Sequence, residues 1–333
     1  LDIEPALATL REKIKDPDYV PDLVRRKLLD NPHRVTLTLR PDQQLEHRRQ
    51  QAIKDALAQR KAQLTEEESR QIVERAKALE ERQMRKDDDS ILPKVGIEDV
   101  PLQRPEPEGR YDAETGATVY SAGTNGLVYQ QVVLPLPELT EEELLMLPYY
   151  ATLISEVGCG ELDYLQMQDR ISAESGGIGA SLTAKGRIDD VQDLSGYVIF
   201  SGKALARNSR ELTDLLKDVY TGARFDEKER IREIIAQIRA RREQAVTGSG
   251  HALAMSAAAQ GLSAGSWLAY RIGGLAAIKA TKELDKALKD EQGLDQFCGK
   301  LQALHDRIRN QKREFLLVGE DEQAAPMLDE LKR

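Results

Sequence analysis

Residues 140–186 read TEEELLMLPYYATLISEVGCGELDYLQMQDRISAESGGIGASLTAKG, and the periodicity of this stretch decides the fold. Thr140 followed three residues later by Glu143 is a capping box, in which the hydroxyl and the carboxylate each bind a backbone N–H group at a helix start. The helix that begins there carries apolar residues at steps of three or four, which predicts one face packed against another element. These residues are Leu144, Leu147, Ala151, Ile154 and Val157.

A second amphipathic helix and a strand follow the first helix after a glycine break. Leu162, Leu165 and Ile171 carry the helical period, and a Gly176-Gly177 turn comes next. From Ile178 to Ala184, apolar residues alternate with small or polar ones, which is typical of a half-buried strand. The stretch therefore predicts two helices that cover a sheet.

The chain before this stretch reads as the end of one domain followed by a helical linker. Residues 1–40 contain two helical segments and then His33–Leu39, where Val, Leu and Leu alternate with Arg and Thr as in a strand. We expect 1–40 to be the C-terminal tail of a preceding α/β domain. Residues 41–92 carry two long, charge-rich helices, the second with a capping box at Thr65, and are predicted to form a helical hairpin linker.

Residues 93–333 are predicted to form the main α/β domain. Residues 115–123 and 127–136 suit a β-hairpin around Asn125-Gly126, because this dipeptide tolerates the positive φ angles of a type I′ turn. Further strands are expected at 194–205 and 314–320, with helices over 225–261, 275–290 and 294–313. The predicted fold class is α+β, with helices layered on a mostly antiparallel sheet and preceded by the long hairpin.

Composition limits the function classes. The chain has 333 residues, 32% of them charged, and a formal net charge of −9, which argues against nucleic-acid binding because phosphate binding needs a basic surface. Its apolar runs are shorter than the ~20 residues that a membrane span needs, so no membrane association is expected. Cys159 and Cys298 lack a metal-binding spacing and indicate free thiols in a reducing compartment, cytoplasmic or other. Because the sequence starts at Leu1, a targeting segment can lie outside it.

No motif in the chain predicts catalysis or metal binding. The histidines are not paired at helical spacing, and we expect them at a strand start, on the hairpin surface, at a helix start and on a helix surface. In this order they are His33, His47, His251 and His305. Gly248-Ser249-Gly250-His251 predicts a break between helices rather than a catalytic serine and histidine. Basic residues interleaved with acids predict a solvated helix face; they are Lys228, Arg230, Arg232, Arg239, Arg241 and Arg242.

Several stretches together resemble the presequence-protease branch of the pitrilysin/insulinase zinc metallopeptidases. They are NPHRVTLTLRPD from residue 31, the two linker helices with TEEE and ALEERQ, TNGLVYQQVVLPLPELTEEELLMLPYYATLISEVGCGELDY from residue 124, ESGGI, FSGKAL and GSGHALA. The resemblance spans nearly the whole chain. It corresponds to the end of the second domain, the hairpin linker and the third, peptidase-associated domain of such an enzyme, without the catalytic domain.

The resemblance implies four related α/β units in two halves that close around unfolded peptides. Catalysis belongs to the first unit, where a glutamate of an HxxEH motif acts as general base on zinc-bound water. This chain contains no HxxEH motif. If its main domain is a degenerate copy of the first unit, the corresponding positions are Leu153, Ser155, Glu156 and Val157, so neither a catalytic residue nor zinc is expected in this segment; zinc belongs to the parent enzyme.

The implied function is a noncatalytic hinge and chamber wall of a zinc-dependent endopeptidase that degrades short unfolded peptides. Its partners would be the N-terminal catalytic half and the fourth domain of the same protein, together with peptide substrates, for which the acidic balance suits cationic sequences. Gly176, Gly177, Ile178 and Ser181 are expected to face the substrate. Uncovered apolar surface makes self-association a further expectation. The alternative is a stand-alone, catalytically inactive interaction module, or a noncatalytic partner subunit of a processing peptidase.

Overall fold

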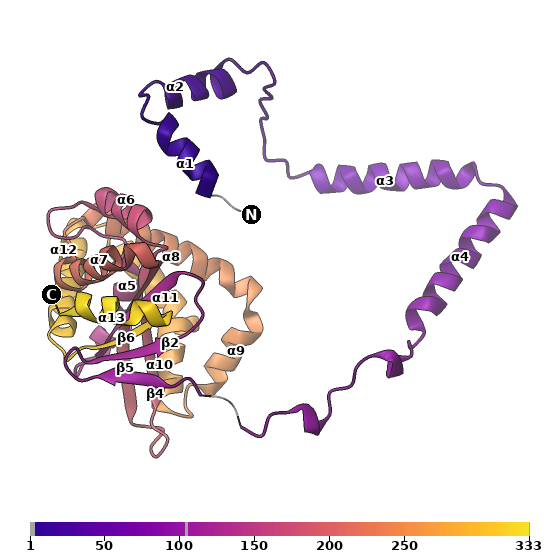
Figure 1. Cartoon of the computed structure of the whole chain (residues 1–333). Coiled ribbons are helices and arrows are strands. Elements are labelled where there is room, and N and C mark those ends of the chain that lie inside the picture. Colours follow the sequence, from indigo (N-terminus) through magenta and orange to yellow (C-terminus); the bar gives the residue numbers. More distant parts are fainter. Residues whose placement is uncertain (1–3, 104–105, 333) are drawn as a thin grey trace. The chain divides into compact units, whose positions relative to one another are not determined.

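The computed structural model describes residues 4–103 and 106–332. Its internal contacts divide the chain into two units, Leu1–Pro101 and Leu102–Arg333, which are treated separately. Figure 1 labels the helices and strands of both units along the chain.

The first unit is helical. Its elements are α1 (Glu4–Lys13), α2 (Tyr19–Val24) with a π-helical continuation (Arg25–Leu29), α3 (Leu45–Ala62), α4 (Glu66–Met84) and two short 3₁₀ turns (Asp89–Ile91 and Ile97–Asp99). The capping box at the start of α4 is confirmed: Thr65 N donates to a Glu68 carboxylate oxygen at 2.9 Å, and Glu68 N donates to Thr65 Oγ1 at 3.2 Å. The two long linker helices form, but neither buries a side chain.

The predicted strand at His33–Leu39 is wrong. These residues have no regular secondary structure, and Val35, Leu37 and Leu39 are 88%, 79% and 86% exposed. Alternation of apolar and polar residues gives a strand only when neighbouring strands pair with its backbone and cover its apolar face. None of the described residues does either for this segment.

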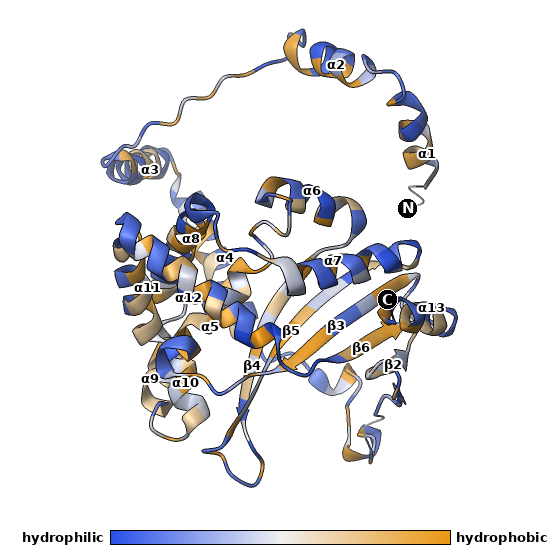
Figure 2. Cartoon of the chain, turned by 90° about the vertical axis from the view of Figure 1, so that its left-hand side faces the viewer, coloured by the Kyte–Doolittle hydropathy of each residue, from blue (hydrophilic) through white to orange (hydrophobic). Residues whose placement is uncertain are grey.

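The second unit is built on one six-stranded sheet within the described residues. Across the sheet the order is β1 (Gly109–Asp112), β2 (Ala117–Ser121), β6 (Glu314–Gly319), β3 (Leu127–Pro135), β5 (Leu194–Leu205) and β4 (Ile178–Gly186). All neighbours are antiparallel except β2 and β6, which are parallel. This confirms the mostly antiparallel sheet. Figure 2 shows β4, β5, β3, β6 and β2 side by side in this order.

The predicted hairpin between β2 and β3 is wrong, because β6 lies between these strands and pairs with both. Asn125 and Gly126 do adopt positive φ angles, 53° and 77°. A dipeptide preference fixes only the local turn, however, whereas strand pairing also depends on residues far along the chain. The hairpin that does form joins β1 to β2, with Gly116 at a φ of 71°.

Helices cover one face of this sheet. The helices that contact it most directly are α5 (Glu141–Leu153), α7 (Ser209–Gly222), α12 (Glu291–Arg309) and α13 (Asp321–Leu331). Outside them or beside them lie α6 (Tyr164–Glu174), α8 (Lys228–Gly248), α9 (Gly250–Ala259), α10 (Ala264–Gly273) and α11 (Leu275–Ala287). Along β3, Val128, Val132 and Leu134 are buried, whereas Tyr129 between them is 37% exposed. One face of the sheet therefore forms the core, and the other remains open.

His305 was predicted on a helix surface, and this is wrong because the side chain is fully buried. It shares the apolar face of α12 with Leu301, Leu304 and Ile308, at the helical spacing that directs it inward. Its Nδ1 lies 2.9 Å from the hydroxyl of buried Tyr150 on α5, while its Nε2 has no hydrogen-bond partner in the structure. This contact links the two central helices of the core.

The basic cluster of α8 is not simply a solvated face. Arg239 Nη1 lies 2.6 Å from the carboxylate of buried Asp285, and Arg242 donates to the Ala277 and Ile272 carbonyls at 3.2 and 3.0 Å. Arg241 is exposed, as predicted. The inward arginines satisfy polar groups of α10 and α11, which an isolated helix pattern does not reveal. The predicted helix break at Ser249 is confirmed, since α8 ends and α9 begins there.

Acidification is expected to destabilise the second unit through His305. Burial lowers the pKa of His305 from 6.5 to about 4. Since the unfolded chain protonates this side chain at a higher pH than the folded chain does, the free energy of unfolding falls as pH decreases from 6.5 toward 4, by at most ~1.4 kcal/mol per pH unit. His305→Gln, which keeps a hydrogen-bonding group without titrating, removes this slope in urea unfolding measured across that pH range. The matched control His251→Gln, at an exposed position, keeps it. Equal slopes for His305→Gln and the unsubstituted chain would contradict the assignment.

Candidate functional site

The turn between α6 and β4 holds the start of the candidate site in a fixed conformation. The Ser175 hydroxyl donates to the Ile171 carbonyl at 2.7 Å and accepts the Gly177 N–H at 3.1 Å. Gly177 has a φ of +109°, a conformation that residues with a β-carbon rarely adopt. Gly176 N then donates to the Lys203 carbonyl at 2.8 Å, so the chain enters β4 already bound to β5.

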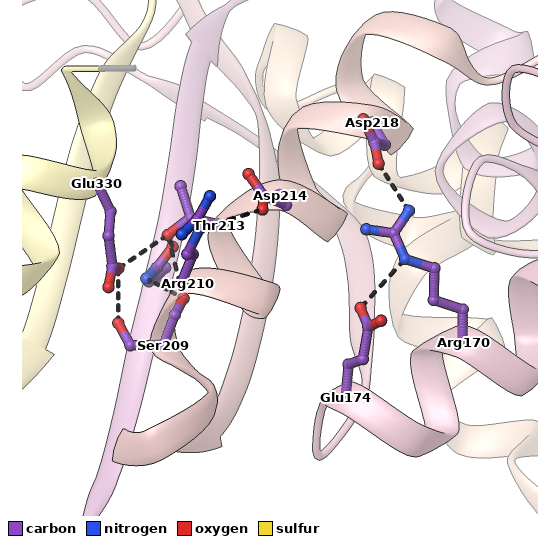
Figure 3. A network of polar contacts seen from close by, with 9 residues as sticks. Arg170, Glu174, Ser209, Arg210, Thr213, Asp214, Asp218 and Glu330 are labelled. Carbon is purple, nitrogen blue, oxygen red and sulfur yellow. Dashed lines mark hydrogen bonds and ion pairs between the residues drawn. The ribbon is translucent and has the colours of Figure 1, made fainter.

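Ion pairs hold α6, the helix that precedes this turn. Arg170 lies between Glu174 on its own helix, at 3.1 Å, and Asp218 on α7, at 2.7 Å (Figure 3). Asn208 Nδ2 donates to the Glu174 carbonyl at 3.1 Å, next to the turn. The position of the turn is thus set by α7 as well as by its own residues.

Strand β4 lies at the edge of the sheet, and half of its backbone polar groups face away from β5. Lys203 N donates to the Gly177 carbonyl and Arg187 N to the Asp193 carbonyl, at 3.4 and 3.0 Å. Because hydrogen-bonded and non-bonded pairs alternate in an antiparallel ladder, the odd-numbered residues of β4 bind β5. Residues 178, 180, 182 and 184 therefore present N–H and C=O groups to the free edge, which can accept an added strand.

The open face beside this edge has a shallow depression of about 410 Å³. It is lined by Tyr129, Gln131, Gly177, Ile178, Gly179, Ser201 and Lys203. The residues of β4 that border it are small, so a second backbone can approach closely. The aliphatic part of Lys203 lies over Gly176, about 3.1 Å from where a Cβ at that position would be. The arrangement offers main-chain hydrogen bonds, an aromatic ring and one ammonium group.

The four residues predicted to face substrate occupy different parts of this edge. Gly176 and Gly177 form the turn, Ile178 packs toward Gly202 on the helix-covered side, and Ser181 is exposed. Their contact with a peptide stays a prediction. Sequence reasoning missed Ala180 and Leu182, whose backbone groups point to the free edge. Only the register with β5 identifies them, and this register depends on residues around 198–200.

The residues present do not fit a zinc ion. Across residues 4–103 and 106–332 there is no group of three or more His, Cys, Asp and Glu side chains able to hold a metal. At the positions expected to correspond to the zinc motif, Leu153 and Val157 are buried in the hydrophobic core. Glu156 instead forms an ion pair with Arg230 at 2.7 Å.

The cysteines are free and buried, as predicted. Burial raises the pKa of Cys159 to about 11 and also raises the pKa of Cys298, so neither is a thiolate nucleophile at neutral pH. Cys159 Sγ lies 2.9 Å from the Asp218 carbonyl oxygen, a structural contact. None of the helices in the described ranges combines the length and apolar character needed to cross a bilayer.

Comparison with known proteins places this architecture among peptidases. The family model described as peptidase-associated, for metallopeptidase family sixteen, subfamily C, matches residues 39–284. The mitochondrial presequence protease of Danio rerio is 28% identical over 290 residues, which cover 85% of this chain and 28% of that protein. Presequence protease 1 of Arabidopsis thaliana is 26% identical over 278 residues, 81% of this chain and 25% of that protein. The chain thus spans about a quarter of the length of these relatives.

The conformation of Gly177 predicts a position-specific loss of stability. Gly177→Ala places a β-carbon at a φ of +109° and is expected to cost about 1–2 kcal/mol in the free energy of unfolding. The matched control is Gly179→Ala, where the β-carbon meets nothing within 4 Å and φ is not in that region, so the change is within about 0.5 kcal/mol. Urea unfolding of the two variants measures this difference. Equal losses would show that the turn does not depend on the glycine.

Proposed function

The chain belongs to this peptidase-associated family, and we propose that it forms a noncatalytic hinge and chamber wall of a zinc-dependent endopeptidase that degrades short, unfolded peptides. The observation that carries this proposal is the family match over 39–284 in a chain whose described residues offer no metal site. In this role the N-terminal catalytic half and the fourth domain of the same protein would be its partners.

The peptide-binding element of the proposal is the free edge of β4. An unfolded peptide has its own backbone donors and acceptors available, and adding it as a strand would pair them with residues 178, 180, 182 and 184. Main-chain pairing of this kind reads little of the peptide's sequence. It would therefore suit a wall that contacts many different substrates.

Charge supports a cationic substrate class. The net charge of −9 favours approach of basic peptides. The relatives from Danio rerio and Arabidopsis thaliana are named as mitochondrial or chloroplastic/mitochondrial presequence proteases. We extend peptide substrates of the presequence type to this chain as part of the proposal, and a reducing compartment remains a prediction from its two free thiols.

A reconstitution experiment tests the proposed role. Zinc content and cleavage of a fluorogenic basic peptide are measured for this chain alone, for a separately produced N-terminal catalytic half, and for the mixture. We expect neither zinc nor activity in this chain alone, and more activity in the mixture than in the catalytic half alone. Stoichiometric zinc in this chain alone would contradict the proposal. A mixture no more active than the catalytic half would instead favour a stand-alone interaction module.

A proline in β4 tests the edge-pairing step. Ala180→Pro removes one outward N–H without removing a bond to β5, and proline is tolerated on edge strands. In the reconstituted mixture we expect KM for the basic peptide to rise about three- to tenfold, the loss of roughly one hydrogen bond. The control is Ala180→Ser, which keeps the N–H and is expected to keep KM. An unchanged KM for Ala180→Pro, with its folding verified by circular dichroism, would exclude pairing at this position.

A further inference from the structure

A second, more enclosed cavity lies on the helix-covered side of the sheet, between β3, β6, α7 and α13. Its volume is about 170 Å³. The residues that give it chemical character are Gln130, Thr213, Tyr220, Arg313, Phe315 and Glu330. It is separate from the β4 edge, because the side chains along a strand alternate between the two faces of the sheet and the depression lies on the open face.

One end of this cavity carries a carboxylate without a cation. Glu330 Oε2 accepts hydrogen bonds from the hydroxyls of Ser209 at 2.7 Å and Thr213 at 3.3 Å (Figure 3). Thr213 also lies 2.9 Å from Oε1 of Gln130, which is only 3% exposed. Among the described residues, no Lys, Arg or His lies within ion-pair distance of Glu330. The carboxylate is thus positioned by neutral groups, and its charge is left for another partner.

The other charged wall is a guanidinium without a carboxylate. The Arg313 guanidinium lies over the rings of Tyr220 and Phe315, with centroid distances of 5.9 and 6.0 Å. No Asp or Glu of the described residues forms an ion pair with it. Stacking on two rings restricts the guanidinium in a way that favours recognition of a planar carboxylate. The cavity therefore has an unpaired anion and an unpaired cation on different walls.

The remaining wall is aliphatic and small. Val132, Leu216 and Leu317 are buried residues that line it. Pockets for drug-sized ligands measure about 300–1,000 Å³, so a cavity of this size suits a molecule of only a few heavy atoms. Opposite charges on one small molecule beside an apolar group are the features of an α-amino acid.

We propose that this cavity binds a free L-amino acid with a small aliphatic side chain, such as leucine or valine. Its ammonium would pair with Glu330, its carboxylate with Arg313, and its side chain would contact Val132, Leu216 and Leu317. Each ligand charge offsets the desolvation of a protein charge that has no partner among the described residues. The inference does not depend on the proposed peptidase role, since it rests on this cavity alone.

Calorimetric titration of the intact chain tests the ligand class. L-leucine is expected to bind. N-acetyl-L-leucine lacks the ammonium and L-leucine methyl ester lacks the carboxylate, so each is expected to bind at least about tenfold more weakly, the loss of one charge-assisted hydrogen bond. Absence of binding by both L-leucine and L-valine, or binding of the two derivatives as tight as that of L-leucine, would overturn the proposal.

Paired substitutions test the two charged residues. Glu330→Gln and Arg313→Gln keep side-chain size and hydrogen-bonding groups, and each is expected to weaken L-leucine binding at least about tenfold. The controls are Asp329→Asn and Lys312→Gln, at the adjacent exposed positions, and both are expected to bind as the unsubstituted chain does. If the controls weaken binding as much as their partners, general surface charge and not this cavity is responsible. The ligand series on the unsubstituted chain remains decisive should a variant fail to fold.

Discussion

The second unit depends on the insertion of β6 between two strands that are close neighbours in sequence. β6 pairs in parallel with β2, where Leu317 faces Val119, and antiparallel with β3, where Phe315 faces Val132. Without β6, the sheet would separate into a β1–β2 hairpin and a group formed by β3, β5 and β4. The sheet therefore becomes continuous only when a segment nearly at the end of the chain reaches its centre. α12 leads directly into β6, and the contact between His305 and Tyr150 on α5 fixes that helix against the core.

This central insertion also determines where the unit can bind other molecules. Because β6 enters in the middle, β4 remains at an edge and keeps its outward N–H and C=O groups. The amino-acid cavity lies where β6 and β3 meet under α7 and α13, so it is complete only after β6 has paired. Arg313 and Phe315, which form one wall, belong to the segment that enters the sheet last in sequence order. The edge and the cavity thus follow from one feature of the topology.

Features that depend on residues a few positions apart could be predicted from the sequence. The capping boxes at Thr65 and Thr140 and the strand at Ile178–Gly186 are of this kind, because the interacting groups lie within one helical turn or one strand. Features that depend on distant residues could not. The turn at Asn125 was recognisable, but the strand that separates β2 from β3 begins almost two hundred residues later. For His305 the signal was present, since Leu301, Leu304 and Ile308 define a buried face that includes it, whereas the ladder partner that fixes the outward groups of β4 lies in another strand.

The distribution of acidic side chains explains why an acidic chain of this kind has structure to offer rather than chemistry. Catalytic carboxylates need partners that shift their pKa and a reacting group within reach. Here Glu156 binds Arg230, Asp218 binds Arg170, and Glu227 accepts the backbone N–H of Tyr164 at 2.9 Å, so each fixes one element against another. A wall that holds peptides through its backbone needs no charged group of its own at the contact. Charge left unpaired inside the unit, as at Glu330 and Arg313, then stands out as a feature that folding alone does not require.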